Sequence, residues 1–91
     1  MSDRLVIFTL EDCIHCISLK MRLNELSITF NEINVDKHPE LWNKIVDETG
    51  NESLPLIFIS EENSDIGNLY IPNVSFNNED EIINIIKSKF L

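Results

Sequence analysis

Residues 4–16 read RLVIFTLEDCIHC and join a short apolar run to two closely spaced cysteines. The run Arg4-Leu5-Val6-Ile7-Phe8-Thr9 is rich in β-branched and aromatic residues, which predicts a strand buried on both faces. Glu11-Asp12 ends this run, and a helix is expected from Cys13 to about residue 27. Its apolar positions recur at spacings of three, four and three, which places on one helical face Cys16, Leu19, Leu23 and Leu26.

The middle of the chain predicts a strand followed by a helix. Apolar and polar residues alternate at the start of the segment 28–35, which indicates a second strand. A helix is expected to begin at Pro39, because proline lacks the N–H that would be unpaired at the first helical position. Gly50 suits a left-handed cap at the end of this helix. Trp42 lies on the apolar stripe of the helix and is expected to be a core residue or a half-buried anchor.

The last third of the chain predicts a hairpin and a final helix. Residues 56–59 and 69–71 are apolar runs separated by a polar, turn-rich segment, and Pro72 suggests an edge position or a bulge beside the second run. Asn78-Glu79-Asp80-Glu81 has the form of a capping box, which predicts a helix start there. This helix carries Ile82, Ile83, Ile85, Ile86 and Phe90.

The order of these elements, β-α-β-α-β-β-α, indicates an α/β fold. We expect a single domain over residues 1–91, since a chain of this length leaves no room for a second. Strands separated by helices favour parallel pairing through right-handed crossovers, and the last two strands favour a hairpin. The expected architecture is a four-stranded mixed sheet flanked by three helices.

Composition and charge disfavour several classes of partner. Sixteen acidic and seven basic residues give a formal net charge of −9, which would repel nucleic acid and anionic membrane surfaces. A basic or neutral protein partner is compatible with this charge. No apolar run approaches the roughly 18–20 residues of a membrane span, and the first residues do not resemble a signal peptide. We therefore expect a cytoplasmic protein that binds neither nucleic acid nor membrane.

Cys13 and Cys16 have the spacing of a redox-active pair. Residues three apart share a helical face with Cβ atoms about 5–6 Å apart, close enough for a disulfide. Such a bond closes a very small loop and adds little stability, so its use would be reversible chemistry. Cys13 lies at the helix N-terminus, where thiol pKa values are lowered. Cys13 is therefore the expected nucleophile, and Cys16, on the apolar face, the expected resolving thiol.

The neighbours of the cysteines leave alternatives open. His15, if protonated or donating a hydrogen bond, would stabilise a Cys13 thiolate, whereas the carboxylates of Glu11 and Asp12 would oppose it. Zinc is an alternative ligand for paired cysteines, but it usually takes four ligands, and here a single pair occurs with only His15 and His38. Two inert cysteines are a further alternative. The strand–CxxC–helix context favours a redox pair without a bound metal.

With Ser53-Leu54-Pro55, this arrangement resembles the glutaredoxin branch of the thioredoxin fold over nearly the whole chain. In that family a C-x-x-C pair opens the first helix, and a T-V-P triplet with a cis proline faces it. The resemblance implies a thioredoxin-like fold in which Pro55 is cis and close to the cysteines. It also implies that the backbone of Leu54 pairs with the cysteine of glutathione in the manner of a β-strand.

The chain departs from the glutaredoxin pattern at three places. Asn77-Asn78 stands where the family has a Gly-Gly pair, although asparagine tolerates the left-handed backbone of such a turn. Asp80 is the best match for the family's contact to the amino end of glutathione. Leu10 replaces the basic residue often found three positions before the first cysteine. The segment 60–77 is longer than the family hairpin, so a longer hairpin or loop is expected.

The resemblance implies a monomeric dithiol oxidoreductase with glutathione as co-substrate and no permanently bound cofactor. Cys13 would attack a protein disulfide or a glutathione mixed disulfide, and Cys16 would resolve it. Some relatives bridge an iron–sulfur cluster between two subunits, mostly with one active cysteine, and the second cysteine here disfavours this. Two alternatives remain. One is an electron donor, for example to ribonucleotide reductase, that is recycled by a flavin reductase, and the other is a binding module with incidental cysteines.

Overall fold

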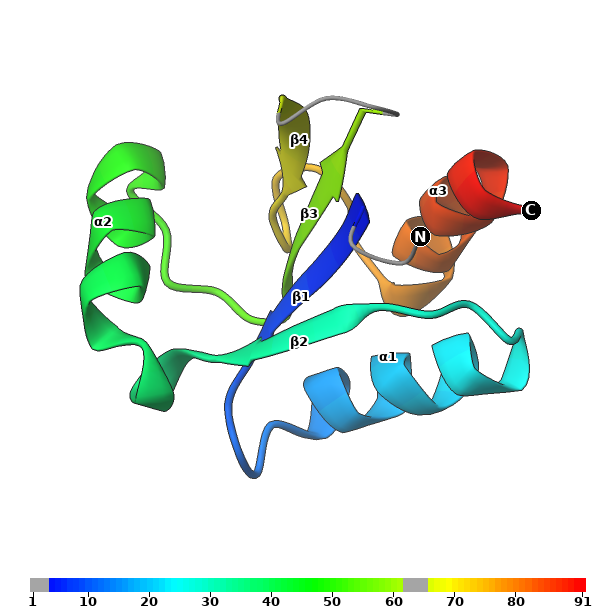
Figure 1. The fold of residues 1–91 in the computed structure, drawn as a ribbon, viewed down its shortest axis with the longest axis horizontal. Helices are drawn as coiled ribbons and strands as arrows, with labels where there is room; N and C mark the ends of the chain where they lie inside the picture. Colours follow the sequence, from blue (N-terminus) through cyan, green and yellow to red (C-terminus); the bar gives the residue numbers. More distant parts are fainter. Residues whose placement is uncertain (1–3, 62–65) are drawn as a thin grey trace.

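The computed structural model describes residues 4–61 and 66–91. Its elements, drawn in Figure 1, confirm the predicted order β-α-β-α-β-β-α. They are β1 (Leu5–Thr9), α1 (Ile14–Glu25), β2 (Asn31–Asn34), the 3₁₀ turn η2 (Val35–Lys37), α2 (Pro39–Thr49), β3 (Leu56–Ser60), β4 (Gly67–Tyr70) and α3 (Glu79–Phe90).

The four strands form one mixed sheet in the order β2-β1-β3-β4, which confirms the predicted α/β, thioredoxin-like fold. β1 and β2 are parallel, as the crossover through α1 requires, and β3 and β4 form the predicted hairpin. The expectation of parallel pairing was wrong for β3, which lies antiparallel to β1. The register gives the reason. Asn34 at the end of β2 pairs with Thr9, and Leu56 at the start of β3 pairs with Phe8, so the chain leaves and re-enters the sheet at the same end.

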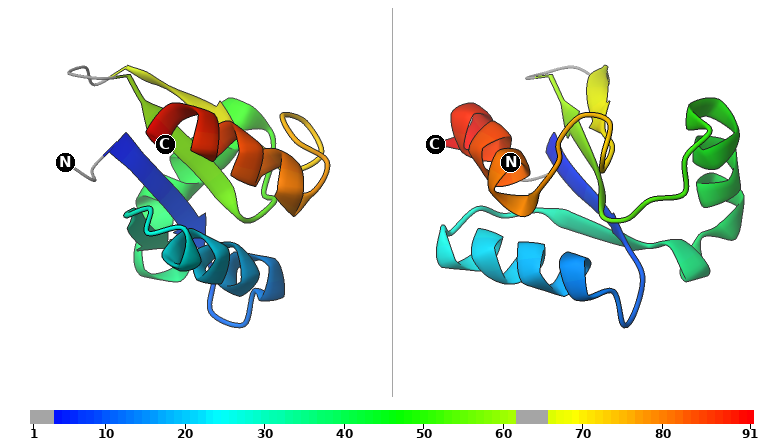
Figure 2. Two further views of the ribbon diagram at one scale, coloured as in Figure 1. Left: turned by 90° about the vertical axis from the view of Figure 1, so that its right-hand side faces the viewer. Right: turned by 180° about the vertical axis from the view of Figure 1, so that it is seen from behind.

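Alternating side chains of β1 and β3 supply two apolar clusters, one on each face of the sheet. The first cluster joins α1 and α3 to one face and is built from the buried residues Leu5, Ile7, Leu19, Leu23, Ile28, Ile57, Ile59, Phe76, Ile82, Ile83 and Ile86. The second joins α2 to the other face through Phe8, Val35 and Leu56, against which pack Val6, Phe58, Trp42 and Ile45. Figure 2 shows the helices on these two sides, so β1 is covered on both faces, as its sequence predicted.

Local hydrogen bonds make β2 shorter than the predicted strand over 28–35. The N–H of Ile28 donates to the carbonyl of Leu23 at 3.0 Å, so this residue still closes the end of α1. At the other end, the side chain of Asn34 accepts a hydrogen bond from the N–H of Asp36 at 2.9 Å. This side-chain cap starts η2 and removes Val35 from the strand.

The ends of α2 follow the sequence signals. Pro39 begins the helix, and Gly50 caps it with φ +68°, the left-handed conformation for which glycine was predicted. Trp42 is half-buried and packs against Phe8 with ring centroids 6.1 Å apart, which confirms its interpretation as an anchor. The helix is therefore fixed to the sheet mainly through its partly buried apolar side chains.

The segment 60–77 contains the β3–β4 hairpin and the turn that leads to α3. Ser60 pairs with Gly67, and residues 62–65 of the expected longer loop lie outside the described residues. A Cβ atom at Gly67 would lie 2.7 Å from Cα of Ser60 and against the carbonyl oxygen of Ile59, which are backbone atoms, so only glycine fits this pairing without movement of β3. Pro72 lies just beyond the edge strand β4 and bridges to Phe76, in agreement with the expected edge position.

Candidate active site

Cys13 and Cys16 form a disulfide at the start of α1, with Cα atoms 5.2 Å apart. Cys13 is the N-cap residue and has an extended backbone, with φ −81° and ψ 105°. Its Sγ accepts a hydrogen bond from the N–H of Cys16 at 3.2 Å. The first sulfur thus occupies the position at which a helix N-terminus offers unpaired N–H groups to an acceptor or an anion.

The two sulfurs differ in their access to solvent. Cys16 is fully buried, with 0% of its surface exposed, whereas Cys13 is partly exposed. Cys16 lies on the buried face of α1, which also carries Leu19 one turn further along the helix. A sulfur from another molecule can therefore reach Cys13 and not Cys16.

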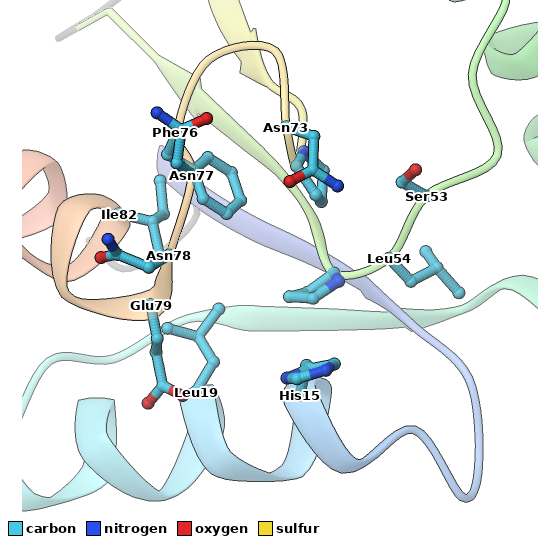
Figure 3. Close-up of a pocket in the computed structure, with 12 residues that line it drawn as sticks. His15, Leu19, Ser53, Leu54, Asn73, Phe76, Asn77, Asn78, Glu79 and Ile82 are labelled. Atoms are coloured by element: carbon cyan, nitrogen blue, oxygen red, sulfur yellow. The ribbon is translucent and has the colours of Figure 1, made fainter.

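A groove of about 580 Å³ lies beside the cysteine pair. Three segments line it, namely the first turns of α1, the loop before β3, and the turn that runs into α3 (Figure 3). His15, which lies between the cysteines in the sequence, lines the groove, whereas Cys13 and Cys16 are not among its lining residues. The lining residues are His15, Leu19, Ser53, Leu54, Pro55, Pro72, Asn73, Phe76, Asn77, Asn78, Glu79 and Ile82.

The loop before β3 has the conformation that the family resemblance implies. The Leu54–Pro55 peptide bond is cis, and both residues line the groove. Pro55 is buried, and Leu54 packs against the second apolar cluster. Figure 3 shows this loop opposite the turn of α1 that carries His15. His15 is exposed, and its influence on a Cys13 thiolate stays a prediction.

Asp80 does not line the groove, although the sequence pointed to it as a binding residue. Its carboxylate is exposed and accepts a hydrogen bond from Nη1 of Arg22 in α1 at 2.7 Å. This interaction is the main cause that raises the pKa of Arg22. Because Asn78 is the N-cap, Asp80 is the second residue of α3, and its side chain lies beside α1.

Glu79 is the acidic residue that the structure places in the groove, and the sequence analysis missed it. Its carboxylate accepts hydrogen bonds from Oγ of Ser18 at 2.8 and 3.1 Å and from Nη1 of Arg22 at 3.3 Å. The signal that could have found it is the cap itself, because a helix capped by Asn78 places Glu79 at the first helical position. No local sequence pattern indicates the contact of Glu79 with Ser18 and Arg22 of α1.

The expected left-handed turn at Asn77-Asn78 is wrong. Asn78 has φ −154°, an extended conformation, because its side chain must cap α3 by accepting a hydrogen bond from the N–H of Glu81. Asn73 is left-handed instead, with φ +65°, and lines the groove together with both of these asparagines. Neutral amide groups therefore make up much of this wall.

The described part of the groove wall carries little positive charge. None of its described lining residues is lysine or arginine, and Glu79 is an anion. Leu10, at the position of the family's basic residue, packs against the second apolar cluster. Within residues 4–61 and 66–91, no three His, Cys, Asp or Glu side chains gather where they could hold a metal ion. No helix in these ranges is long and apolar enough to cross a membrane.

A thioredoxin-like fold with a cysteine pair at the start of the first helix and a cis proline in the loop across the groove is typical of thiol–disulfide oxidoreductases. The chain belongs to the glutaredoxin family, whose model matches residues 5–63. It is 37% identical over 51 residues to the glutaredoxin-like protein NrdH of Lactococcus lactis subsp. cremoris (strain MG1363). The aligned residues make up 56% of this chain and 69% of that protein. The chain is 35% identical to the glutaredoxin-like protein NrdH of Lactococcus lactis subsp. lactis (strain IL1403), again over 51 residues that make up 56% of this chain and 69% of that protein.

The family match divides the groove into two parts. Residues 5–63 include both cysteines, Leu54 and Pro55. The wall from Pro72 to Glu79 lies beyond the matched range. Both cysteines therefore lie in the matched part, while one wall of the groove lies outside it.

Proposed function

We propose that this protein reduces disulfide bonds in other proteins through its two cysteines. The Cys13 thiolate attacks one sulfur of the substrate disulfide, forms a mixed disulfide and releases the other sulfur as a thiolate. The Cys16 thiolate then attacks Sγ of Cys13, which forms the Cys13–Cys16 disulfide and releases the second substrate thiolate. Two electrons pass from the dithiol to the substrate. The observation that carries this proposal is the exposure difference between the two sulfurs.

The helix N-terminus supports Cys13 as the nucleophile. In the disulfide its Sγ already accepts the N–H of Cys16 at 3.2 Å. The same amide and the positive end of the helix dipole would stabilise the anion once the disulfide is reduced. These groups are fixed by the backbone and need no rearrangement to act on the thiolate.

Glutathione is the electron source that membership of the glutaredoxin family favours. The cis Pro55 loop supports this, because Leu54 and Pro55 line the same groove as His15. In this scheme the thiolate of one glutathione attacks Sγ of Cys13 and releases the Cys16 thiolate. The thiolate of a second glutathione then attacks the glutathione sulfur of this mixed disulfide, which forms oxidised glutathione and releases the Cys13 thiolate. Asp80 has no part in this proposal, because its carboxylate is paired with Arg22 outside the groove.

A second candidate is a protein electron donor recycled by a flavin reductase, with ribonucleotide reductase as a partner. One observation favours it over glutathione. The described lining residues of the groove include no lysine or arginine to bind the carboxylates of glutathione. The similarity to proteins named glutaredoxin-like protein NrdH supports the same candidate.

Two cysteine variants test the proposed exchange. Cys13→Ser should reduce exchange with a protein disulfide to background, because the attacking thiolate is gone. Cys16→Ser should still attack, and should accumulate a mixed disulfide visible by mass spectrometry. Residual turnover in Cys13→Ser, or no trapped adduct in Cys16→Ser, would contradict the assigned roles.

The electron source is tested on the unmodified protein with NADPH consumption as the readout. Glutathione with glutathione reductase should sustain turnover if glutathione is the co-substrate. Turnover that requires a thioredoxin reductase, and does not respond to glutathione, would select the second candidate.

A further inference from the structure

The face of α1 that points away from the sheet is apolar. Its core-facing side already buries Cys16, Leu19 and Leu23. On the outward side Ile14, Ile17 and Met21 are 76%, 46% and 61% exposed. Their spacing of three and four residues makes a continuous stripe on the helix surface. A helix of a globular protein normally carries polar side chains on its outward face, and exposed apolar patches often mark interaction sites.

The stripe begins inside the redox motif. Ile14 directly follows the reactive Cys13, so a protein whose disulfide meets this sulfur must also cover Ile14. The stripe then runs along α1 away from the groove-lining His15. Figures 1 and 2 show α1 along one border of the molecule, with its outer side clear of the other described helices.

The charges around the stripe are acidic. Glu11 and Asp12 are exposed just before it, and Glu25 is exposed at the far end of α1. The two cations of the helix are engaged elsewhere, since Lys20 pairs with Glu32 at 2.7 Å and Arg22 pairs with the carboxylates at the start of α3. Among the described residues, these three carboxylates near the stripe have no ion-pair partner.

We propose that the stripe of Ile14, Ile17 and Met21 docks the protein whose disulfide Cys13 attacks. That protein presents apolar side chains bordered by lysine or arginine, which complement the apolar stripe and its acidic ends. A second copy of this chain does not fit, because two molecules of net charge −9 repel each other. The proposal rests on the proposed function and adds a binding surface outside the groove.

Single-turnover exchange with pre-reduced protein tests this surface without any electron source. The probes are two peptides of equal length with one internal disulfide each, one carrying leucine and lysine beside the cysteines and the other serine and glutamate. Bis(2-hydroxyethyl) disulfide serves as the small substrate. Wild type should reduce the leucine–lysine peptide about tenfold faster than the other peptide at low concentration. This ratio corresponds to about 1.4 kcal/mol of binding.

The double variant Ile17→Ser/Met21→Ser should lower this preference several-fold and keep its rate on the small disulfide; the part that remains comes from the unchanged acidic residues at the ends of the stripe. Leu41→Ser is the matched control, because Leu41 is an apolar residue of α2 that is 41% exposed. This variant should keep both the peptide preference and the rate on the small disulfide. An unchanged peptide preference in the double variant, or an equal loss in the control, would overturn the docking surface. Failure of wild type on all three disulfides would instead reject the proposed function.

Discussion

Thr9 connects the strand before the cysteines to α1 and β2. This side chain is almost fully buried, and its hydroxyl donates to Oε2 of Glu32 at 2.6 Å. Nζ of Lys20 donates to the same oxygen at 2.7 Å. The Lys20 ammonium, followed by the Thr9 hydroxyl, lowers the pKa of Glu32 below its ordinary value. Both donors favour the ionised carboxylate, so folding and ionisation of Glu32 are coupled.

The variant Glu32→Gln should change the pH dependence of stability. Because the folded-state pKa is below the unfolded value of 4.5, the ionised carboxylate contributes stability above that pH. The contribution is lost as the pH falls through the folded-state pKa. Urea unfolding should therefore show a wild-type advantage at pH 7 that shrinks as the pH is lowered below 4.5. It should be below about 1 kcal/mol, since the carboxylate is partly exposed.

Glu48→Gln is the control for this measurement, because Glu48 is exposed on α2 and should leave the pH dependence unchanged. An advantage of wild type over Glu32→Gln that is equal at pH 7 and pH 3 would contradict the coupling.

Single residues of the site differ in how far the sequence predicts them. Cys13, Cys16 and Pro55 belong to a spacing pattern that is visible in the chain itself. Glu79 and Asn73 enter the groove through the packing of α3 against α1 and through a left-handed turn. Asp80 illustrates the limit, because its partner Arg22 is 58 residues away and no local pattern announces this pair.

At the scale of elements, α3 depends on its cap. The side chain of Asn78 accepts the N–H of Glu81 at 2.9 Å, and the carboxylate of Glu81 accepts the N–H of Asn77 at 2.7 Å. The capping box predicted from sequence is thus present in a form displaced by one residue, since its second bond reaches Asn77 and not the N-cap residue. Together these bonds fix the segment that forms one wall of the groove.

The variant Asn78→Ala should lower the free energy of unfolding by about 1 kcal/mol, because the N–H of Glu81 loses its acceptor. Chemical denaturation measures this change. Asn84→Ala is the control, since Asn84 is exposed in the interior of the same helix and alanine favours helix there. Equal losses in the two variants would show that the cap contributes nothing.

Element order, helix boundaries and caps were predictable because spacing, proline, glycine and asparagine act locally. The direction of β3 could not be predicted in this way, because it depends on the end of the sheet at which the chain returns after α2. The length of β2 was also missed. Its ends are fixed by the carbonyl of Leu23 and the side chain of Asn34, which apolar alternation does not reveal.

The whole molecule carries a charge of −9, and this charge should govern its rate of encounter with partners. Exchange with a lysine-bearing peptide disulfide should slow several-fold when ionic strength rises from 0.02 to 0.5 M, because salt screens the attraction. The rate on neutral bis(2-hydroxyethyl) disulfide should stay constant. Stopped-flow measurements at several salt concentrations give both slopes.

Glu11→Gln/Asp12→Asn should flatten the salt dependence for the cationic peptide, because these carboxylates border Cys13. Glu40→Gln/Glu48→Gln, which removes two charges from α2, should flatten it less. The same slope in all of these proteins would show that the attraction has no local origin.

Trp42 is the single tryptophan of the chain, and its ring lies against Phe8 on the sheet face opposite the helix that carries the cysteines. Intrinsic tryptophan fluorescence of this protein therefore has one source, an indole that extends from α2 toward the sheet. Its emission will follow the loosening of that half of the core during unfolding, while cysteine oxidation is followed separately by thiol labelling. The chain thus carries its own optical reporter for one face of the sheet.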